Sequence, residues 1–191
     1  MAVFLARPSE KLLPSYLEAI QEGPYCNMAL GFGDDPLPVI LEDSDAYLHK
    51  LNNPAPYEYK MPDGSLFSIT DHELYWISDG NRFIGSVPLR YMGDDAFIQN
   101  FCGHIGMAIR PSLLNRGYGV RALIHALTLA RAAARSKGMD ALLASCDKKN
   151  NASMRLIEHA GGKLVRSHDG FCGAQHNLIY QLNVENALSE A

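Results

Sequence analysis

The sequence IRPSLLNRGYGVRAL (residues 109–123) joins an apolar, strand-like run to a helical pattern through a short polar turn. Pro111 ends the run, because proline cannot donate a hydrogen bond within a sheet. Gly117 and Gly119 then stand two residues apart, directly before the helical pattern. This arrangement predicts either a plain tight turn or an anion site. In an anion site, the unpaired N–H groups of a helix start meet a phosphate with no β-carbon in the way.

The turn differs from the two common nucleotide-binding motifs. A phosphate loop of the G-x-x-x-x-G-K-[ST] type is absent, and no G-x-G-x-x-G follows the apolar run. Arg116 and Arg121 flank the glycines and would add positive charge to an anion site. The sequence of the turn therefore disfavours a nucleotide-binding function.

Length and composition predict one soluble domain, or at most two, over residues 1–191. The chain has 191 residues, of which 47% are hydrophobic and 20% charged, with a net charge of −4. These values allow one sizeable core and give no bulk charge for nucleic acid or a membrane surface. No apolar run approaches the roughly 20 residues of a membrane span, and the N-terminus lacks the pattern of a secretory leader. We therefore expect a cytoplasmic protein with no nucleic-acid and no membrane partner.

The cysteines and histidines predict neither a metal site nor a disulfide framework. No C-x-x-C pair is present, and the seven histidines show no metal-ligand spacing. We expect reduced thiols at the four cysteines, which are Cys26, Cys102, Cys146 and Cys172.

The N-terminal third of the chain predicts helices and a loop. SEKLLPSYLEAIQEG (residues 9–23) has the apolar spacing of a helix, with Ser9 or Ser15 as its cap and Gly23 as its stop. EDSDAYLHKLNN (residues 42–53) is a second helix candidate, with acids in its first turn. NNPAPYEYKMPDG (residues 52–64) contains three prolines and predicts a loop.

The remainder alternates strands and helices, which predicts an α/β chain with a mixed sheet. Residues 72–91 predict a hairpin that turns at Asp79, Gly80 and Asn81. Residues 119–137 predict a long helix that stops at Gly138. The other expected elements are strands at 103–111, 140–146, 163–168 and 177–184, and a helix at 150–162.

The unit strand–IRP–NRGYG–long helix resembles motif A of the GNAT acyltransferase superfamily. LLASCDKKNNASMRLIEHAGG (residues 142–162) resembles the next strand and helix of that family, and the hairpin YWISDGNRFIGSVPLR (residues 75–90) resembles the strands ahead of motif A. The match covers residues 73–184, within a subgroup known mainly as predicted acetyltransferases, and leaves residues 1–72 as a variable N-terminal part. The resemblance implies the GNAT acyl-CoA N-acyltransferase fold. That fold has a mixed, mostly antiparallel sheet with a V-shaped splay between its two central strands and helices on both faces.

The same resemblance implies acetyl-CoA as co-substrate, bound in the gap between the strands HIGMAIR (residues 104–110) and DALLASC (residues 140–146). Leu114 stands where the family usually has Arg or Gln, so a side-chain role is weakened there. The pyrophosphate would bind the N–H groups of Asn115, Arg116, Gly117, Tyr118, Gly119 and Val120. The pantetheine arm would bind the backbone near Met107, Ala108 and Ile109. Asn150, or Asn151 as the near alternative, would contact the CoA arm in the place of the family's helix-start Asn, and Ser153 is a further candidate contact. The side chain of Tyr118 packs or faces solvent.

The catalytic residues are open at this stage. Acetyl transfer needs a neutral amine, so a group must take its proton. His104 titrates in a suitable range, although a structural histidine is the alternative. Asp147 is a second candidate base, or a turn or cap residue. The family's usual tyrosine acid is replaced by Ile157, so Cys146, Ser153 or a water would supply the proton, or CoA leaves as the thiolate.

The resemblance thus predicts an N-acetyltransferase that acts on a small-molecule or peptide amine, and it is compatible with a homodimer. The alternative is a non-catalytic, acyl-CoA-binding regulatory module. The resemblance implies that the first helices, the hairpin and the closing strands select the acceptor, and Glu73 and Arg90 are candidates for facing it. An acidic group would form a solvated face or favour a cationic acceptor. Its members are Asp34, Asp35, Glu42, Asp43 and Asp45.

Overall fold

The computed structural model describes residues 2–22, 37–60, 64, 66–93, 95–171 and 174–184. The chain divides into two compact units. The first comprises Met1–Ala55, His72–Leu89 and Met107–His125, and the second Pro56–Asp71, Arg90–Gly106 and Ala126–Ala191. The single domain expected over residues 1–191 stays a prediction.

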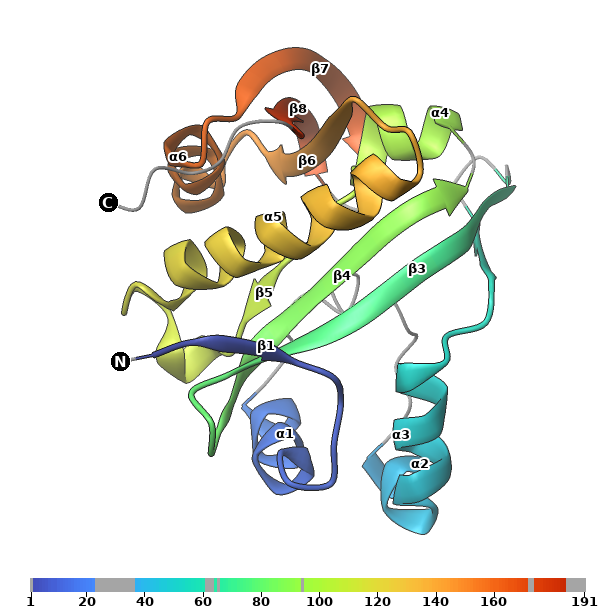
Figure 1. The fold of residues 1–191 in the computed structure, drawn as a ribbon, viewed down its shortest axis with the longest axis vertical. Coiled ribbons are helices and arrows are strands. Elements are labelled where there is room, and N and C mark those ends of the chain that lie inside the picture. The colour runs from blue at the N-terminus through green and yellow to red at the C-terminus, as the bar shows by residue number, and fades with distance from the viewer. Residues whose placement is uncertain are drawn as a thin grey trace. The chain divides into compact units, whose positions relative to one another are not determined.

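The first unit is built on a sheet with the strand order β1-β3-β4-β5 (Figure 1). These strands are β1 (Phe4–Ala6), β3 (Leu66–Ser78), β4 (Phe83–Gly93) and β5 (Ala108–Ile109), of which β3 and β4 continue into the second unit. β1 pairs antiparallel with β3, and β5 pairs antiparallel with β4. The predicted hairpin is confirmed, and β3 begins several residues before its expected start.

Three helices contribute to the core of this unit: α1 (Leu13–Gln21), α2 (Leu37–Glu42) and α3 (Ser44–Asn52). Tyr16 of α1 stacks on Trp76 of β3 with ring centroids 4.6 Å apart and meets the edge of Phe83 at 5.1 Å. Its hydroxyl lies 2.6 Å from the hydroxyl of Tyr47 of α3. Buried aromatic rings of this size supply much of the apolar area that stabilises a core.

The helix starts correct one expectation and confirm another. Neither Ser9 nor Ser15 caps α1, whose N-cap is Leu12 with no side-chain hydrogen bond. The Ser15 hydroxyl instead accepts a hydrogen bond from the N–H of Phe83 at 3.1 Å, so a tertiary contact has taken the place of a cap. Asp43 caps α3 by accepting from the N–H of Ala46 at 2.8 Å. The predicted stop at Gly23 and the acids Asp34 and Asp35 lie outside the described residues.

The second unit contains an antiparallel sheet with the order β6-β8-β7. Its strands are β6 (Ala141–Asp147), β7 (Lys163–Phe171) and β8 (Ala174–Asn183), and α6 (Asn151–His159) connects β6 to β7. β2 (Tyr57–Lys60) pairs with the start of β3, so the predicted loop at 52–64 was wrong for these four residues. α4 (Asp95–Phe97) and a π-helical turn (Ile98–Cys102) were not predicted.

The segment that was predicted as one strand, residues 103–111, is shorter in the structure. Only Ala108–Ile109 form a strand, whereas Gly103 and Ile105 make isolated bridges to Ala144 of β6. β5 and β6 therefore belong to separate sheets, and the V-shaped splay between them stays a prediction.

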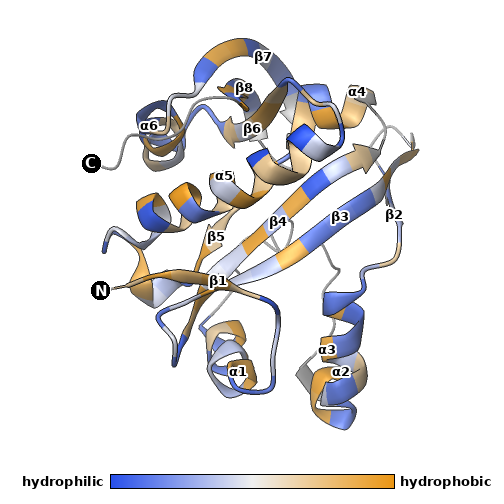
Figure 2. Cartoon of the chain, in the orientation of Figure 1, coloured by the Kyte–Doolittle hydropathy of each residue, from blue (hydrophilic) through white to orange (hydrophobic). Residues whose placement is uncertain are grey.

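The long helix α5 (Tyr118–Ser136) is confirmed, and Gly138 follows it with a φ of +70°. Figure 2 shows hydrophobic and hydrophilic residues mixed along α5, as expected for a helix with one buried face. The buried residues include Ala122, Leu123, Ala126, Leu127, Ala130 and Ala134. In the part of the chain that the structure describes, no helix is long and apolar enough to cross a membrane.

Candidate functional site

The glycine turn lies between β5 and α5, and its backbone is bent twice into the left-handed region. A short 3₁₀ turn (Pro111–Leu113) follows β5. Asn115 then has a φ of +59° and Gly117 a φ of +77°. A β-carbon placed on Gly117 would meet no atom within 4 Å. Glycine is thus needed here for its conformation, and the space above it is open to a ligand.

The first turn of α5 follows at once, and the first four N–H groups of a helix have no carbonyl partner within it. Together with the helix dipole, such groups attract an anion. The loop residues Asn115, Arg116 and Gly117 and the helix residues Val120 and Arg121 are exposed, and Gly119 is half-buried. The geometry thus allows both an anion site and a plain turn.

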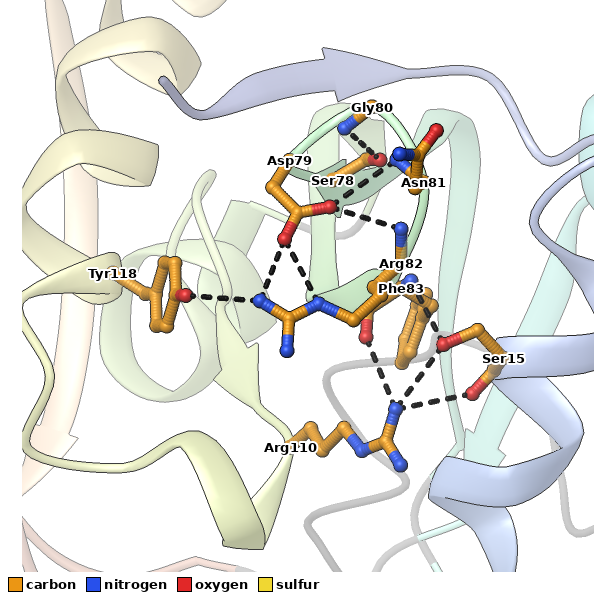
Figure 3. Close-up of polar contacts among 9 residues, drawn as sticks. All are labelled: Ser15, Ser78, Asp79, Gly80, Asn81, Arg82, Phe83, Arg110 and Tyr118. Atoms are coloured by element: carbon orange, nitrogen blue, oxygen red, sulfur yellow. Dashed lines mark hydrogen bonds and ion pairs between the residues drawn. The ribbon is translucent and has the colours of Figure 1, made fainter. Parts of the chain in front are cut away.

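Tyr118, the first residue of α5, is buried and faces the hairpin turn (Figure 3). Its hydroxyl lies 3.4 Å from Nη2 of Arg82. Asp79 holds the Arg82 guanidinium at both Nε (2.9 Å) and Nη2 (2.7 Å), and these contacts lower the pKa of Asp79 although desolvation opposes them. The side chain of Tyr118 is therefore packed, which was one of its two expected roles, the other being exposure to solvent. Only its backbone can contact a ligand at the loop.

On the other side of the loop, Arg110 links the end of β5 to α1. Its Nη1 donates to the Ser15 hydroxyl at 3.2 Å (Figure 3), and its Nε donates to Glu22 at 2.5 Å. Glu22 also accepts from the N–H (3.0 Å) and the hydroxyl (2.8 Å) of Ser112. Desolvation raises the pKa of Glu22, but the hydrogen bonds from Ser112 and Arg110 outweigh it and the pKa is lowered. Sequence reasoning missed this cluster, because its two halves lie about 90 positions apart and neither half forms a motif.

β5 is the last strand in its sheet, so one of its edges bears backbone groups that point away from β4. The N–H of Arg110 donates to the carbonyl of Ile84 at 2.8 Å. Backbone groups alternate in direction along an antiparallel strand, so those of Ala108 also point towards β4 and those of Met107 and Ile109 point outwards. Of the three strand residues predicted to bind the cofactor, Met107 and Ile109 thus have the suitable direction.

The candidate acid–base residues lie in the second unit, where at least three hydrogen bonds hold His104. Its N–H donates to the carbonyl of Leu143 at 2.7 Å, its carbonyl accepts from the N–H of Arg90 at 2.8 Å, and its Nδ1 accepts from the N–H of Leu143 at 2.8 Å. A neutral ring that accepts at Nδ1 carries its proton on Nε2. These contacts favour the structural histidine, because a base would have to give up the bond at Nδ1.

Cys146 and Asp147 end β6. Burial raises the pKa of the Cys146 thiol to about 11, with Asp147 and Glu158 adding to the rise. The thiol is therefore neutral near pH 7 and is not a ready nucleophile. The Asp147 carboxylate accepts from the N–H of Lys149 at 2.6 Å, which is the turn role that was expected as an alternative to catalysis.

Asn150 is the N-cap of α6, and its Oδ1 accepts from the N–H of Ser153 at 3.0 Å. Its Nδ2 keeps two hydrogen atoms that can be donated to a ligand. Asn151 is exposed and Ser153 is half-buried, whereas Ile157 is buried. Cap and ligand contact are thus compatible at Asn150, and Ile157 supplies no acid.

The described residues contain no group of three or more metal-binding side chains, and Cys102 and Cys146 are unbridged. Cys26 and Cys172 lie outside the described residues. Nothing in the described part of the chain therefore points to a metal-dependent site.

Comparison with known proteins agrees with this picture. A family model described as an acetyltransferase (GNAT) domain matches residues 5–163. No curated protein matches the sequence.

Several solved structures with a similar fold are acetyltransferases. A GNAT-family acetyltransferase from Bacillus anthracis is 15% identical, with a TM-score of 0.57 and 97% of each chain covered. The microcin C7 self-immunity acetyltransferase MccE, solved with acetyl-CoA and AMP, is 13% identical with a TM-score of 0.60, covering 95% of this chain and 92% of its own. RimJ from Mycobacterium smegmatis, solved with CoA disulfide, is 13% identical with a TM-score of 0.61, covering 96% of this chain and 82% of its own. At these identities the likeness shows the fold.

Proposed function

The chain belongs to the GNAT acetyltransferase family, and from this premise we propose that it transfers the acetyl group of acetyl-CoA to a primary amine by direct attack. The observation that carries the proposal is the turn before α5. Asn115 and Gly117 both adopt positive φ there, and the chain enters a 19-residue helix at Tyr118. The start of a long helix suits a pyrophosphate, and the loop residues before it are exposed.

The residues present fit the cofactor in two places. Backbone N–H groups from Asn115 to Val120 would bind the pyrophosphate, with Arg116 and Arg121 adding positive charge. The outward edge of β5 at Met107 and Ile109 would bind the pantetheine amides in the manner of an added strand. Further contacts with the cofactor would come from Asn150, Asn151 and Ser153.

The chemistry asks for little covalent help from the protein. The amine nitrogen attacks the thioester carbonyl, the C–S bond breaks, and CoA leaves with its sulfur as the acceptor of a proton. An outward N–H of β5 would stabilise the oxyanion that forms in between. A buried, neutral Cys146 (pKa about 11) is ill-suited to carry the acetyl group. These properties favour direct transfer in a ternary complex over an acetyl-enzyme.

The proposed bases that remove the proton from the amine are His104, Asp147 or a water. Nδ1 of His104 and Oδ1 of Asp147 each accept a backbone hydrogen bond. His104 would lose that bond on taking the proton, whereas Asp147 would take it on its second carboxylate oxygen, and a water would need neither side chain.

The second candidate function is a regulatory module that binds acyl-CoA without turnover. It is favoured by the buried Ile157 in the place of the family's tyrosine and by the engaged Nδ1 of His104. Release of free CoA, detected with a thiol reagent, separates the two functions. The assay uses acetyl-CoA with a panel of polyamines, aminoacyl compounds and peptides with free amino termini. Amine-dependent release supports the enzyme, whereas tight acetyl-CoA binding without release for every amine supports the module.

A further inference from the structure

The Glu22 carboxylate, just after α1, uses both of its oxygens on the turn that leads into the glycine loop. Oε1 accepts from Arg110 Nε at 2.5 Å and from the Ser112 hydroxyl at 2.8 Å, and Oε2 accepts from the Ser112 N–H at 3.0 Å. Only Leu113 and Leu114 separate Ser112 from Asn115, the first loop residue with positive φ. One carboxylate thus fastens the chain at the entry to the loop.

We propose that Glu22 is a positioning residue for the phosphate-binding loop, acting through Arg110 and Ser112. The inference rests on the proposed function, because it assumes that the loop binds the pyrophosphate of acetyl-CoA. It adds a residue from the N-terminal part of the chain, which carries no recognisable motif.

The loop needs such support because its shape is not the intrinsic preference of its residues. A non-glycine residue with positive φ carries a strain that the surrounding structure must offset, and Asn115 is such a residue. Hydrogen bonds to a charged group are shorter and stronger than neutral ones. The three bonds from Glu22 therefore fix the loop before a ligand arrives, which lowers the entropy cost of binding.

Arg110 could instead be a ligand for the phosphate, but its surroundings argue against that role. Its guanidinium is largely buried and faces α1. Nη1 lies 3.2 Å from the Ser15 hydroxyl, and Nη2 lies 3.6 Å from Glu18. With Glu22 at Nε, the positive charge is already matched by two carboxylates, so Arg110 serves as a link.

Glu18 offers a matched control. Its side chain is 69% exposed, and its contact is with Arg110 Nη2, whereas Glu22 is 21% exposed and also bonds to Ser112. Glu18→Gln and Glu22→Gln remove the same charge from the same helix end. Only Glu22→Gln places an amide donor against the N–H and O–H donors of the loop entry.

The test measures CoA binding by calorimetry and pantetheine binding by NMR titration, for the wild type, Glu22→Gln, Glu18→Gln and Gly117→Glu. Pantetheine lacks the pyrophosphate. We expect Glu22→Gln to raise the CoA Kd about tenfold, or about 1.4 kcal/mol, with the pantetheine Kd unchanged. We expect Glu18→Gln to stay within about twofold of the wild type. A merely structural role would lower the melting temperature and leave the CoA-to-pantetheine ratio as it is.

The outcomes separate the inference from the function beneath it. A Glu22→Gln protein that binds CoA like the wild type, while Gly117→Glu does not bind, overturns the role of Glu22 and leaves the proposed function standing. A wild type that does not bind CoA overturns both. If Glu22→Gln does not fold, Ser112→Ala removes one of the three bonds and is expected to raise the CoA Kd about threefold with no change for pantetheine. An unchanged Kd in Ser112→Ala overturns the inference.

Discussion

Gly85 of β4 stands opposite Ile109 of β5, at a point where the two strands approach very closely. A β-carbon on Gly85 would lie 2.1 Å from the carbonyl oxygen of Ala108 and 3.1 Å from the Ala108 carbonyl carbon. Both atoms are backbone, so no flexible side chain can move aside. The substitution Gly85→Ala therefore forces the strands apart by at least about 1 Å to reach an ordinary contact distance.

The expected cost follows from that displacement. Weaker β4–β5 pairing, which includes the 2.8 Å bond from the Arg110 N–H to the Ile84 carbonyl, costs about 1–2 kcal/mol, and overpacking adds about 1–3 kcal/mol. For a chain of this size the sum of about 2–5 kcal/mol lowers the melting temperature by about 4–20 °C. β5 is also the proposed site of the pantetheine arm, so we expect the acetyl-CoA Kd to rise about tenfold.

The assay is thermal unfolding followed by circular dichroism, with calorimetric titration of acetyl-CoA. Gly80→Ala in the hairpin turn is the control. Gly80 has a φ of +101°, and a β-carbon there meets nothing within 4 Å. Its cost is backbone strain of about 1–2 kcal/mol, with no effect on acetyl-CoA binding. A Gly85→Ala protein that keeps both the wild-type melting temperature and the wild-type affinity would refute the close approach and the binding role of β5.

Three further predictions concern Cys146 and Asn150. We expect Cys146→Ala to keep acetyl-CoA turnover within about threefold of the wild type, because the neutral thiol does not carry the acetyl group. Intact-mass spectrometry of the wild type with acetyl-CoA should show no acetyl-enzyme. An acetylated Cys146 would contradict direct transfer. Because the Cys146 pKa is raised from 9.0 to about 11 on folding, the unfolded state loses its proton first. The free energy of unfolding is therefore expected to fall as the pH rises from 9 to 11, and to fall less in Cys146→Ala. Urea unfolding at a series of pH values measures this. Equal dependence of the unfolding free energy on pH in both proteins would count against the buried thiol. Asn150→Ala lowers stability by about 1 kcal/mol through loss of the cap, whereas Asn150→Asp keeps the cap and the melting temperature but weakens acetyl-CoA binding. A calorimetric scan and titration of both variants check this, and equal binding by Asn150→Asp would remove Asn150 from the cofactor site.

The elements with a clear periodic pattern were predicted from the sequence. The apolar spacing along α5 and the stop at Gly138 indicate that helix, and Asp79-Gly80-Asn81 indicate the hairpin turn. These signals are local, because one helical face or one tight turn is encoded within a short window. The loop at Asn115 and Gly117 is predictable for the same reason.

The misses have a different origin. The prolines around β2 predict a loop, yet Tyr57–Lys60 pair with β3 in a register that only the tertiary structure supplies. The position of Ser15 predicts a cap for α1, but its hydroxyl bonds to Phe83 and Arg110 instead. In both cases a distant partner replaces a local one, and a single sequence does not show which of the two is chosen.

In the candidate site, too, local features were predictable and contacts between distant residues were not. The turn at Asn115 and Gly117 before α5 was predictable, because glycines and a helix start mark it. The clamp formed by Glu22, Arg110 and Ser112 was not, since it depends on α1 lying against the end of β5. The sequence allows a turn role for Asp147 and a cap role for Asn150, and the structure shows both contacts.

The central claim is that the loop before α5 binds the pyrophosphate of acetyl-CoA. Calorimetric titration of acetyl-CoA into the wild type and into the double variant Gly117→Glu/Gly119→Glu tests it most directly. We predict micromolar binding to the wild type and none to the variant, whose circular dichroism spectrum stays that of the folded protein. Absence of binding by the wild type, or equal binding by the folded variant, would contradict the account.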